Sequence, residues 1–336
     1  MKNVTIIGAG SFGTALALVL DRAGNSVQMW AREKNIADTI NNDHINPGYL
    51  SDVKLPEAIE AYNNLEHCLT GQDMVVFATP SHTLRDVATK LKPCLNGDEI
   101  LVTVSKGIEN DTFKTMSQVL VEVMEGVTYE DSIGVLYGPS HAEEVIKLKP
   151  TTIVASAYSS RTARIIQETF LTPMFRVYIN NDIMGVEIGG SVKNIMAIAA
   201  GIIDGAELGD NAKAALITRG LHEMRRMGIT LGAHSDTFAG LTGMGDLIVT
   251  CTSSHSRNRS VGYRIGKGEK LTDVIKSMNM VAEGIKTTKS VRDWSLKNNI
   301  EMPITHAIYS VLFEGVDPRD ALYELMTRDP KDEIVM

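Results

Sequence analysis

The chain has 336 residues, of which 43% are hydrophobic and 5% aromatic, and its formal net charge is -8. This length exceeds what one simple hydrophobic core fills, so we expect two packed domains. The negative charge argues against a nucleic-acid binder and against a membrane-surface binder, because both classes need a surplus of Lys and Arg.

Residue types and their spacing also indicate the cellular compartment and whether a metal site is expected. The three cysteines are odd in number and show no CxxC spacing, which favours a reducing cytoplasm over a disulfide framework or a thiolate zinc site. The longest apolar stretch, 195–203, is too short to cross a bilayer, and no signal segment precedes the first expected strand, so we expect no membrane insertion. The histidines form no ligand pair at i, i+4, so we expect no metal, and His141, His222 and His255 are expected to be capping or surface residues.

The chain opens with an apolar β-branched run at 4–7, which ends at a glycine-rich turn and is followed directly by a small-residue helix. This order predicts strand, tight turn and helix, the arrangement in which a helix N-terminus binds a pyrophosphate. Gly8 permits the reversal, Gly10 lets bare backbone approach the phosphates, and Gly13 lets the helix pack against the strand. An ordinary strand-to-helix turn is the alternative.

The residue after the second expected strand, 26–30, bears on the choice of nucleotide. An NAD-preferring site usually places Asp or Glu there to hold the ribose hydroxyls, whereas this chain has Arg32, whose guanidinium suits a 2′-phosphate. We therefore expect NADP(H) to be preferred and NAD(H) to be possible. Glu33 is the rival, since it could accept a hydrogen bond from a ribose hydroxyl while Arg32 points to solvent.

Strands and helices alternate through the first half, which predicts a doubly wound parallel sheet. Lys106 follows one of the expected strands and is a candidate substrate residue, with a solvated loop lysine as the alternative. Ser140 follows Gly138 and Pro139 and is expected to cap the next helix, and its turn emerges at the same edge of the sheet. The further strands are expected at 74–78, 100–104, 133–137, 151–156 and 175–179.

The hydrophobic period changes after Asp182, and the chain becomes almost wholly helical. We therefore predict a dinucleotide-binding Rossmann-like domain at 1–180 and a helical substrate-binding domain at 181–336. The segment 184–203 is apolar nearly all round and is expected to be a central buried helix, thinned at Gly189 and its neighbour where another backbone or a ligand comes close.

Lys193 lies in the middle of this apolar helix, where a charged group is costly unless it meets an anion or loses its proton. Glu187 lies six positions back and is not one turn away on the same face. We expect Lys193 to face a ligand, either a negatively charged substrate or the oxygen of a reacting carbonyl, with its pKa depressed by burial and by a second cation such as Lys106. A lysine that reaches solvent from the helix is the alternative.

Two later segments carry polar chemistry. A glycine-rich stretch leads to Asp246, which either caps the helix that follows, holds Lys193 in position or binds a substrate hydroxyl. The segment 253–259, Ser-Ser-His-Ser-Arg-Asn-Arg, is the densest set of phosphate donors in an acidic chain, and an exposed polar loop is its alternative.

Together, these positions resemble the NAD(P)-dependent glycerol-3-phosphate dehydrogenases of the bacterial type, and the resemblance extends over essentially the whole chain. The motifs that carry it are residues 8–15, 105–109, 138–142, 187–194, 240–247, 250–251, 256–258 and 281–284. The resemblance implies reversible hydride transfer between the nicotinamide and C2 of dihydroxyacetone phosphate, giving sn-glycerol 3-phosphate for phospholipid synthesis. It also suggests a homodimer.

The resemblance further implies roles for individual residues. Lys193 would be the proton acceptor in oxidation and the acid in reduction, Lys106 would polarise the carbonyl, and Asp246 would share the catalytic site. The other implied substrate residues are Gly138, Ser140, Ser256, Arg257 and Asn258. The implied cofactor residues are Gly8, Gly10, Ser11, Phe12, Gly13, Arg32, Tyr49, Lys106, Ala142, Arg257, Val281 and Glu283.

Two other functions stay open on the sequence alone. One is a two-domain 3-hydroxyacid dehydrogenase acting on a carboxylate, which the cluster 256–258 disfavours. The other is a nucleotide-sensing protein without turnover, which a lysine inside an apolar helix disfavours.

Overall fold

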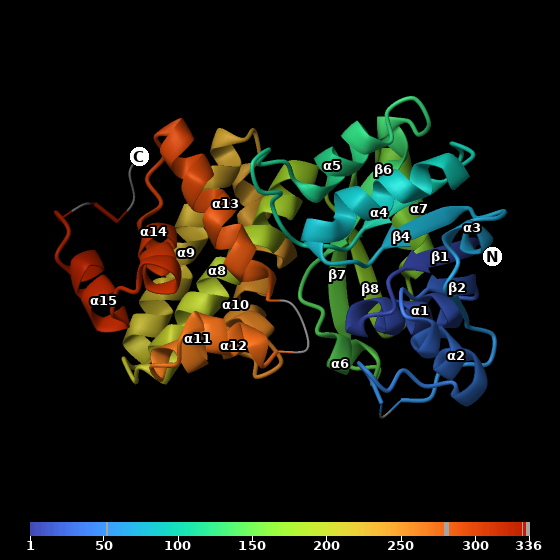
Figure 1. The fold of residues 1–336 in the computed structure, drawn as a ribbon. Helices are drawn as coiled ribbons and strands as arrows, with labels where there is room; N and C mark the ends of the chain where they lie inside the picture. Colours follow the sequence, from blue (N-terminus) through green and yellow to red (C-terminus); the bar gives the residue numbers. More distant parts are fainter. Residues whose placement is uncertain (52, 279–281, 331, 334–336) are drawn as a thin grey trace.

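The computed structural model describes residues 1–51, 53–278, 282–330 and 332–333. Within these residues, eight strands form one sheet in the order β3-β2-β1-β4-β5-β6-β7-β8 (Figure 1). The strands are β1 Asn3–Ile7, β2 Ser26–Trp30, β3 Glu60–Tyr62, β4 Met74–Phe77, β5 Ile100–Thr103, β6 Ile133–Tyr137, β7 Thr151–Ala157 and β8 Phe175–Ile179.

Both faces of this sheet are covered, which explains why its strands are continuous apolar runs. Successive side chains point to opposite faces, so Ile6 and Val76 belong to one core while Ile7 and Val75 belong to the other. α1, α2 and α7 contribute to the first core, and α4 and α5 contribute to the second. The helices of this half are α1 Ser11–Arg22, α2 Lys34–Asp43, α3 Leu65–Cys68, α4 Leu84–Leu91, α5 Met116–Val123, α6 Ala142–Val145 and α7 Ser160–Phe170.

The expectation of a wholly parallel sheet is wrong for its last two strands. β1 to β6 run parallel, but β7 pairs antiparallel with β6, and β8 runs parallel to β7. The connection from β6 to β7 contains only the four-residue helix α6, and no long helix crosses the sheet there. Antiparallel neighbours need no such crossover, so the strand returns in the opposite direction.

The second half is built around α8, which the apolar segment 184–203 predicted correctly. α8 spans Ile183–Gly205 and packs against the helices that surround it. Gly189 permits a close approach, since a Cβ there would lie 2.5 Å from the carbonyl oxygen of Thr242. The surrounding helices are α9 Asp210–Thr230, α10 Asp246–Thr252, α11 Arg257–Gly266, α13 Glu283–Asn298 and α14 Pro303–Tyr309, with α12 Leu271–Lys276 and α15 Pro318–Met326 further out.

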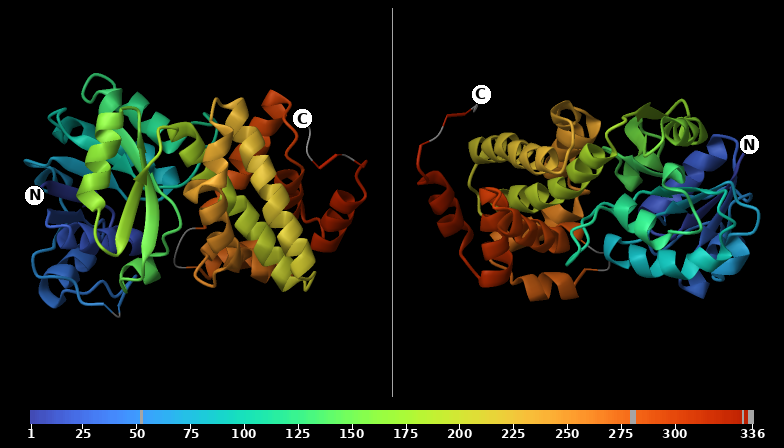
Figure 2. Two further views of the ribbon diagram at one scale, coloured as in Figure 1. Left: turned by 180° about the vertical axis from the view of Figure 1, so that it is seen from behind. Right: turned by 90° about the horizontal axis from the view of Figure 1, so that it is seen from above.

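The helical half stands beside the sheet half, and in the view from behind β7 and β8 are the strands nearer to it (Figure 2). α8 is longer than the apolar stretch 195–203 alone suggests, and by length and composition it could cross a membrane. The whole of its apolar window is nevertheless buried inside the protein.

Candidate active site

A cavity of about 550 Å³ lies where the carboxyl ends of the strands meet the helical half. Gly8 and Gly10 line it from the turn after β1, while Lys193 and Asp246 line it from α8 and α10. In a doubly wound sheet, ligands bind outside the carboxyl ends of the strands at the point where the strand order reverses. β1 lies at that point here, between β2 and β4.

The glycine turn fits a dinucleotide pyrophosphate. Gly8 has φ +119, and a Cβ there would lie 2.8 Å from the carbonyl oxygen of Ala78. A Cβ on Gly13 would lie 2.1 Å from the carbonyl oxygen of Gly8, so this glycine lets α1 pack against the turn. Gly10 has open space where a side chain would stand, which leaves backbone N–H groups at the start of α1 accessible to an anion.

The part of the cavity beyond the C-terminal end of β2 is lined by Arg32, Glu33 and Tyr49. The Arg32 side chain is 79% exposed, and its guanidinium donates to the Glu33 carboxylate, with 2.8 Å between Nε and Oε1. The two rivals for the ribose are therefore bonded to each other, and a nucleotide phosphate would compete with Glu33 for the guanidinium.

Lys193 and Lys106 converge on one carboxylate, that of Asp246. Lys193 Nζ donates to Asp246 Oδ1 and, at 2.7 Å, to the hydroxyl of Thr250. Lys106 Nζ donates at 2.8 Å to Asp246 Oδ2 and at 2.9 Å to the carbonyl oxygen of Gly138. Lys193 is 5% exposed, so the alternative of a lysine that reaches solvent is wrong.

Burial and neighbouring charges set the proton affinities of this cluster. Burial is the largest influence on Lys193 and lowers its pKa to about 8, with Asp246 opposing the change and Lys106 adding to it. Burial acts against ionisation of Asp246, but Lys106 and Lys193 outweigh it and hold the pKa of that carboxyl below its usual range. The arrangement is a buried ammonium that can exchange a proton close to neutral pH, beside a carboxylate that stays ionised.

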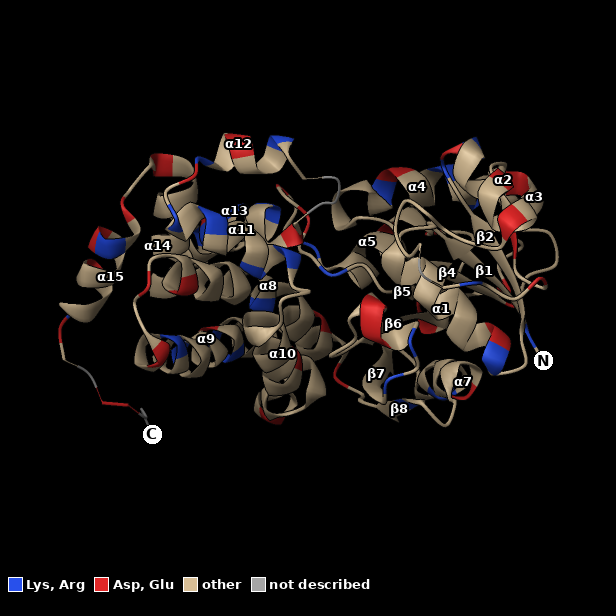
Figure 3. Ribbon diagram, turned by 90° about the horizontal axis from the view of Figure 1, so that it is seen from below, with Lys and Arg blue, Asp and Glu red and all other residues tan. Residues whose placement is uncertain are grey.

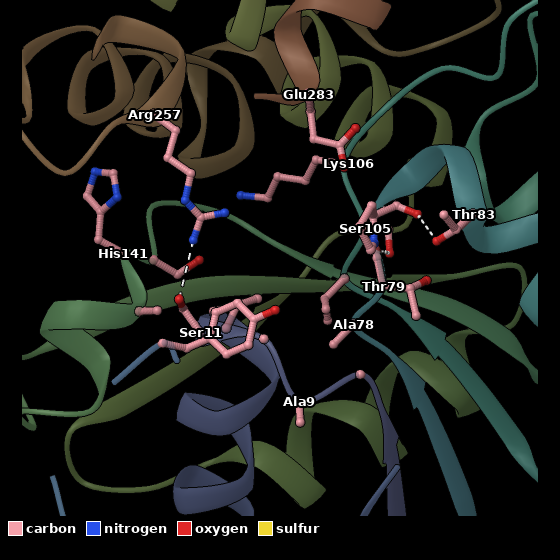
Figure 4. Close-up of a pocket in the computed structure, with 18 of the residues that line it drawn as sticks. Ala9, Ser11, Ala78, Thr79, Thr83, Ser105, Lys106, His141, Arg257 and Glu283 are labelled. Atoms are coloured by element: carbon pink, nitrogen blue, oxygen red, sulfur yellow. Dashed lines mark hydrogen bonds between the residues drawn. The ribbon is translucent and has the colours of Figure 1, made fainter. Parts of the chain in front are cut away.

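Arg257, Ser256 and Asn258 enter the cavity from the start of α11. The Arg257 guanidinium extends toward the sheet half and donates to the Ser11 hydroxyl at 3.4 Å (Figure 4). Basic segments on α8 and α11 stand among the helices at the end of the helical half near the sheet (Figure 3). This end of the cavity offers a planar donor group and a helix N-terminus to an anion.

Glu283, at the start of α13, ties the two halves together. Its carboxylate accepts hydrogen bonds from the backbone N–H of Ser81, at 2.9 Å, and from the Ser81 hydroxyl, at 2.5 Å. Burial raises the pKa of Glu283. The same side chain lines the cavity, so a cofactor that contacts it would act on the connection between the halves.

Comparisons with known proteins agree with this geometry. The family described as NAD-dependent glycerol-3-phosphate dehydrogenase N-terminus matches residues 3–163, and the corresponding C-terminus matches residues 182–323. The chain belongs to this family. It is 51% identical to a glycerol-3-phosphate dehydrogenase (NAD(P)+) of Chlorobium limicola over 99% of both chains, and 50% identical to one of Salinibacter ruber over 98% of this chain and 96% of that one.

A crystal structure of glycerol-3-phosphate dehydrogenase from Coxiella burnetii resembles this member of the family over its whole length. The TM-score is 0.92 at 38% sequence identity, and the match covers 97% of this chain and 99% of that chain. The predicted arrangement of a Rossmann-type half followed by a helical half is therefore confirmed.

In this member of the glycerol-3-phosphate dehydrogenase family, most of the predicted site residues line one cavity. Gly13 and Gly138 do not: Gly13 packs against the turn, and Gly138 contributes its carbonyl oxygen to Lys106. Val281 lies outside the described residues. The predicted residues that line the cavity are Gly8, Gly10, Ser11, Phe12, Arg32, Tyr49, Lys106, Ser140, Ala142, Lys193, Asp246, Ser256, Arg257, Asn258 and Glu283.

Three local expectations are corrected. Ser140 does not cap α6, because that helix begins two residues later at Ala142, and the Ser140 hydroxyl donates to the carbonyl oxygen of Gly138. Asp246 does not cap α10 either, because it is the first residue of that helix and its carboxylate is taken by the two lysines. Arg259 is not a ligand donor, since its guanidinium pairs with Asp204 at 2.6 Å.

Other residues that shape the site were not among those predicted for it. Asn46 is buried, and its amide donates at 2.8 Å to the carbonyl oxygen of Ala9 and to the Thr14 hydroxyl, which fixes the glycine turn. Nothing in the sequence around Asn46, which lies in a loop, predicts this contact. For Thr250 the sequence did offer an indication, since it lies four residues after Asp246 and therefore on the same face of a helix. His141, expected to be a capping or surface residue, is the N-cap residue of α6 without a side-chain cap hydrogen bond, and it also lines the cavity.

Proposed function

We propose that this protein is an sn-glycerol-3-phosphate dehydrogenase that reversibly reduces dihydroxyacetone phosphate, uses NADPH in preference to NADH, and supplies sn-glycerol 3-phosphate for glycerophospholipid synthesis. The observation that supports this most directly is the buried Lys193 ammonium beside Asp246, in a cavity that also contains the glycine turn and Arg257. The names of the relatives point to the same reaction.

The cofactor residues divide by the part of the dinucleotide they hold. Gly8, Gly10, Ser11 and Phe12 surround the pyrophosphate position at the start of α1. Arg32 binds the 2′-phosphate, and Tyr49 lies beside the nucleotide. The cofactor residues toward the helical half are Lys106, Ala142, Arg257 and Glu283. When bound, the reduced nicotinamide supplies the hydride.

The phosphate of the substrate binds at the start of α11, where Arg257 and Ser256 offer donors. Asn258 acts mainly by shaping this end, since its amide donates to the Asn194 side chain at 3.0 Å and accepts from the backbone N–H of Gly284 at 2.9 Å. Because phosphate binding is remote from the reacting carbon, its energy orients the ketone.

The proton moves through Lys193. In reduction, Lys193 Nζ donates a proton to the carbonyl oxygen as that oxygen becomes negative, and in oxidation the neutral amine accepts it. Lys106 supplies positive charge to the same oxygen, and Asp246 keeps both ammonium groups directed at it. Ser140 borders the substrate on the side of β6, and Gly138 acts from outside the cavity through its carbonyl oxygen, which accepts from Lys106 and from Ser140.

We also propose a division into domains at 1–180 and 181–336, since β8 ends at Ile179 and α8 begins at Ile183. A cytoplasmic location is consistent with the free cysteines Cys68, Cys94 and Cys251. A homodimer would cover apolar side chains exposed near the C-terminus, such as Phe313 and Met326, and light scattering of the eluting protein measures that state.

One assay tests the central proposal. Purified protein is mixed with NADPH and dihydroxyacetone phosphate, and the loss of reduced-nicotinamide absorbance is followed alongside chromatographic detection of sn-glycerol 3-phosphate. A panel of ketones with a phosphate or a carboxylate separates this activity from a 3-hydroxyacid dehydrogenase. Absence of NADPH oxidation with every phosphorylated ketone contradicts the proposal.

A further inference from the structure

His141 is a cavity residue to which the proposed reaction has so far assigned no role. It is the N-cap residue of α6, in the turn between β6 and β7, and its side chain lines the cavity. In the described part of the chain, its Nε2 atom is shielded from solvent and has no hydrogen-bond partner. A buried polar nitrogen without a partner is destabilising, so its presence here points to a ligand that completes the hydrogen bond.

The position of the ring indicates which part of a substrate it would meet. Lys193 and Lys106 are already directed at Asp246, the region where the carbonyl would react. The His141 ring instead has its centroid 5.9 Å from that of His255, which lies two residues before Arg257, the first residue of α11. His141 is therefore near the end of the cavity that offers donors to an anion.

Both ammonium groups and carboxylates surround His141. Burial is the largest influence and lowers the pKa of His141; Lys193 and Lys106 lower it further, whereas Glu143 and Asp246 oppose them, so the free protein disfavours the imidazolium form. The charged and titratable groups that face it are Lys193 from α8, Lys106 after β5, Asp246 from α10, Glu143 from α6, and His255 and Arg257 around the start of α11.

We propose that His141 is a ligand of the substrate's phosphate group, donating an imidazole N–H to it and taking up a proton as the phosphate dianion binds. The proposal rests on the proposed function for the identity of the substrate. A phosphate dianion attracts the imidazolium form and so favours it, which adds a charge-assisted hydrogen bond to those of Arg257.

Kinetics with paired substrates tests the contact. His141→Phe keeps a ring of similar shape and removes the donor, and we expect it to raise the KM for dihydroxyacetone phosphate by about tenfold to a hundredfold. With unphosphorylated dihydroxyacetone, its kcat/KM should match that of the wild type, as should its affinity for NADPH. His141→Asn restores an N–H donor, so its KM for dihydroxyacetone phosphate should lie between those of the wild type and His141→Phe. His222→Asn, on α9, is the matched control.

Calorimetry tests the proton. Inorganic phosphate is titrated into the NADP+-bound protein at a pH where phosphate is a dianion, in two buffers of different ionisation enthalpy. Wild type and His222→Asn should take up a proton on binding, and both His141→Phe and His141→Asn should not.

The outcomes separate the two proposals. Equal proton uptake in the His141 variants, or an equal change with both ketones, overturns the assignment of His141. If the wild type fails to reduce dihydroxyacetone phosphate, the proposed function fails, while the phosphate titration still decides whether His141 binds phosphate. Thermal unfolding of each variant shows whether a loss comes from misfolding, and His141→Asn keeps the test valid if His141→Phe does not fold.

Discussion

Replacing Asp246 by Asn removes the negative charge that Lys193 and Lys106 share while keeping the shape of the side chain. Lys193 binds its proton with a pKa of about 8 instead of the ordinary 10.5 because burial disfavours the ammonium and Lys106 repels it, with Asp246 opposing both. Without that carboxylate, the neutral amine is favoured further, so the pKa of Lys193 must fall.

The size of the change follows from the electrostatics of the cluster. Two unit charges about 4 Å apart attract by ~4 kcal/mol at an effective dielectric constant of about 20. Asp246 divides its charge between two lysines, and the Asn amide oxygen still accepts a hydrogen bond, so we take about a third of this value as lost. That loss weakens proton binding to Lys193 about tenfold.

The assay is kcat/KM for each substrate against pH in both directions, because kcat/KM reports the pKa of the free enzyme. Reduction needs the ammonium, so in the wild type it should fall as pH rises through about 8, whereas oxidation needs the amine and should rise through the same range. In Asp246→Asn, both transitions should move about one pH unit lower.

Asp204→Asn is the matched control, because Asp204 is also shared by two cations, Lys213 and Arg259, in the same half of the molecule. This variant should leave both pH transitions in place. The reasoning is refuted if Asp246→Asn leaves the transitions unmoved or shifts them to higher pH, or if Asp204→Asn shifts them equally.

Three other changes test separate parts of the site. Lys193→Met should lower kcat about 10²-fold to 10⁴-fold with NADPH affinity retained by fluorescence titration, and turnover within tenfold of wild type would contradict a role in proton transfer. Arg257→Ala should raise the KM for dihydroxyacetone phosphate about tenfold or more with little change in kcat, since a phosphate contact is made in both the ground and transition states; an effect confined to kcat would exclude this. Arg32→Ala should raise the KM for NADPH about tenfold and, by freeing Glu33, leave or improve that for NADH, whereas a parallel loss with both nucleotides would show that Arg32 does not read the 2′-phosphate.

A stability measurement, taken separately from these kinetics, tests the glycine turn. Gly13→Ala should destabilise the protein by about 1–3 kcal/mol in denaturant unfolding, because the new Cβ would lie 2.1 Å from the carbonyl oxygen of Gly8. Gly24→Ala is not a suitable control, since Gly24 has φ +82 and a side chain there is strained regardless of space. Gly10→Ala is suitable, because its Cβ meets open space.

Patterns among neighbouring residues in the sequence were sufficient to predict several helices and strands of this protein. The apolar runs and the glycine turn predicted β1 and α1, and the all-round apolar segment predicted α8 with Lys193 buried inside it. These features depend on residues close together in the sequence: strand alternation, helix period and the backbone freedom of Gly8 are set within a few positions.

Which partner each of those residues meets was decided only by tertiary structure, since the sequence left Asp246 with three alternative roles, one of them holding Lys193. Lys193 meets Asp246, 53 positions later, and Asp246 in turn meets Lys106, 140 positions away. Which carboxylate neutralises a buried lysine depends on how α8 and α10 pack, and periodicity carries no information about that packing. Tertiary structure also decided that His141 lines the cavity and that Arg259 points away from it toward Asp204. The direction of each side chain depends on the residue at which its helix begins, α6 for His141 and α11 for Arg259, and the sequence does not fix helix ends to one residue.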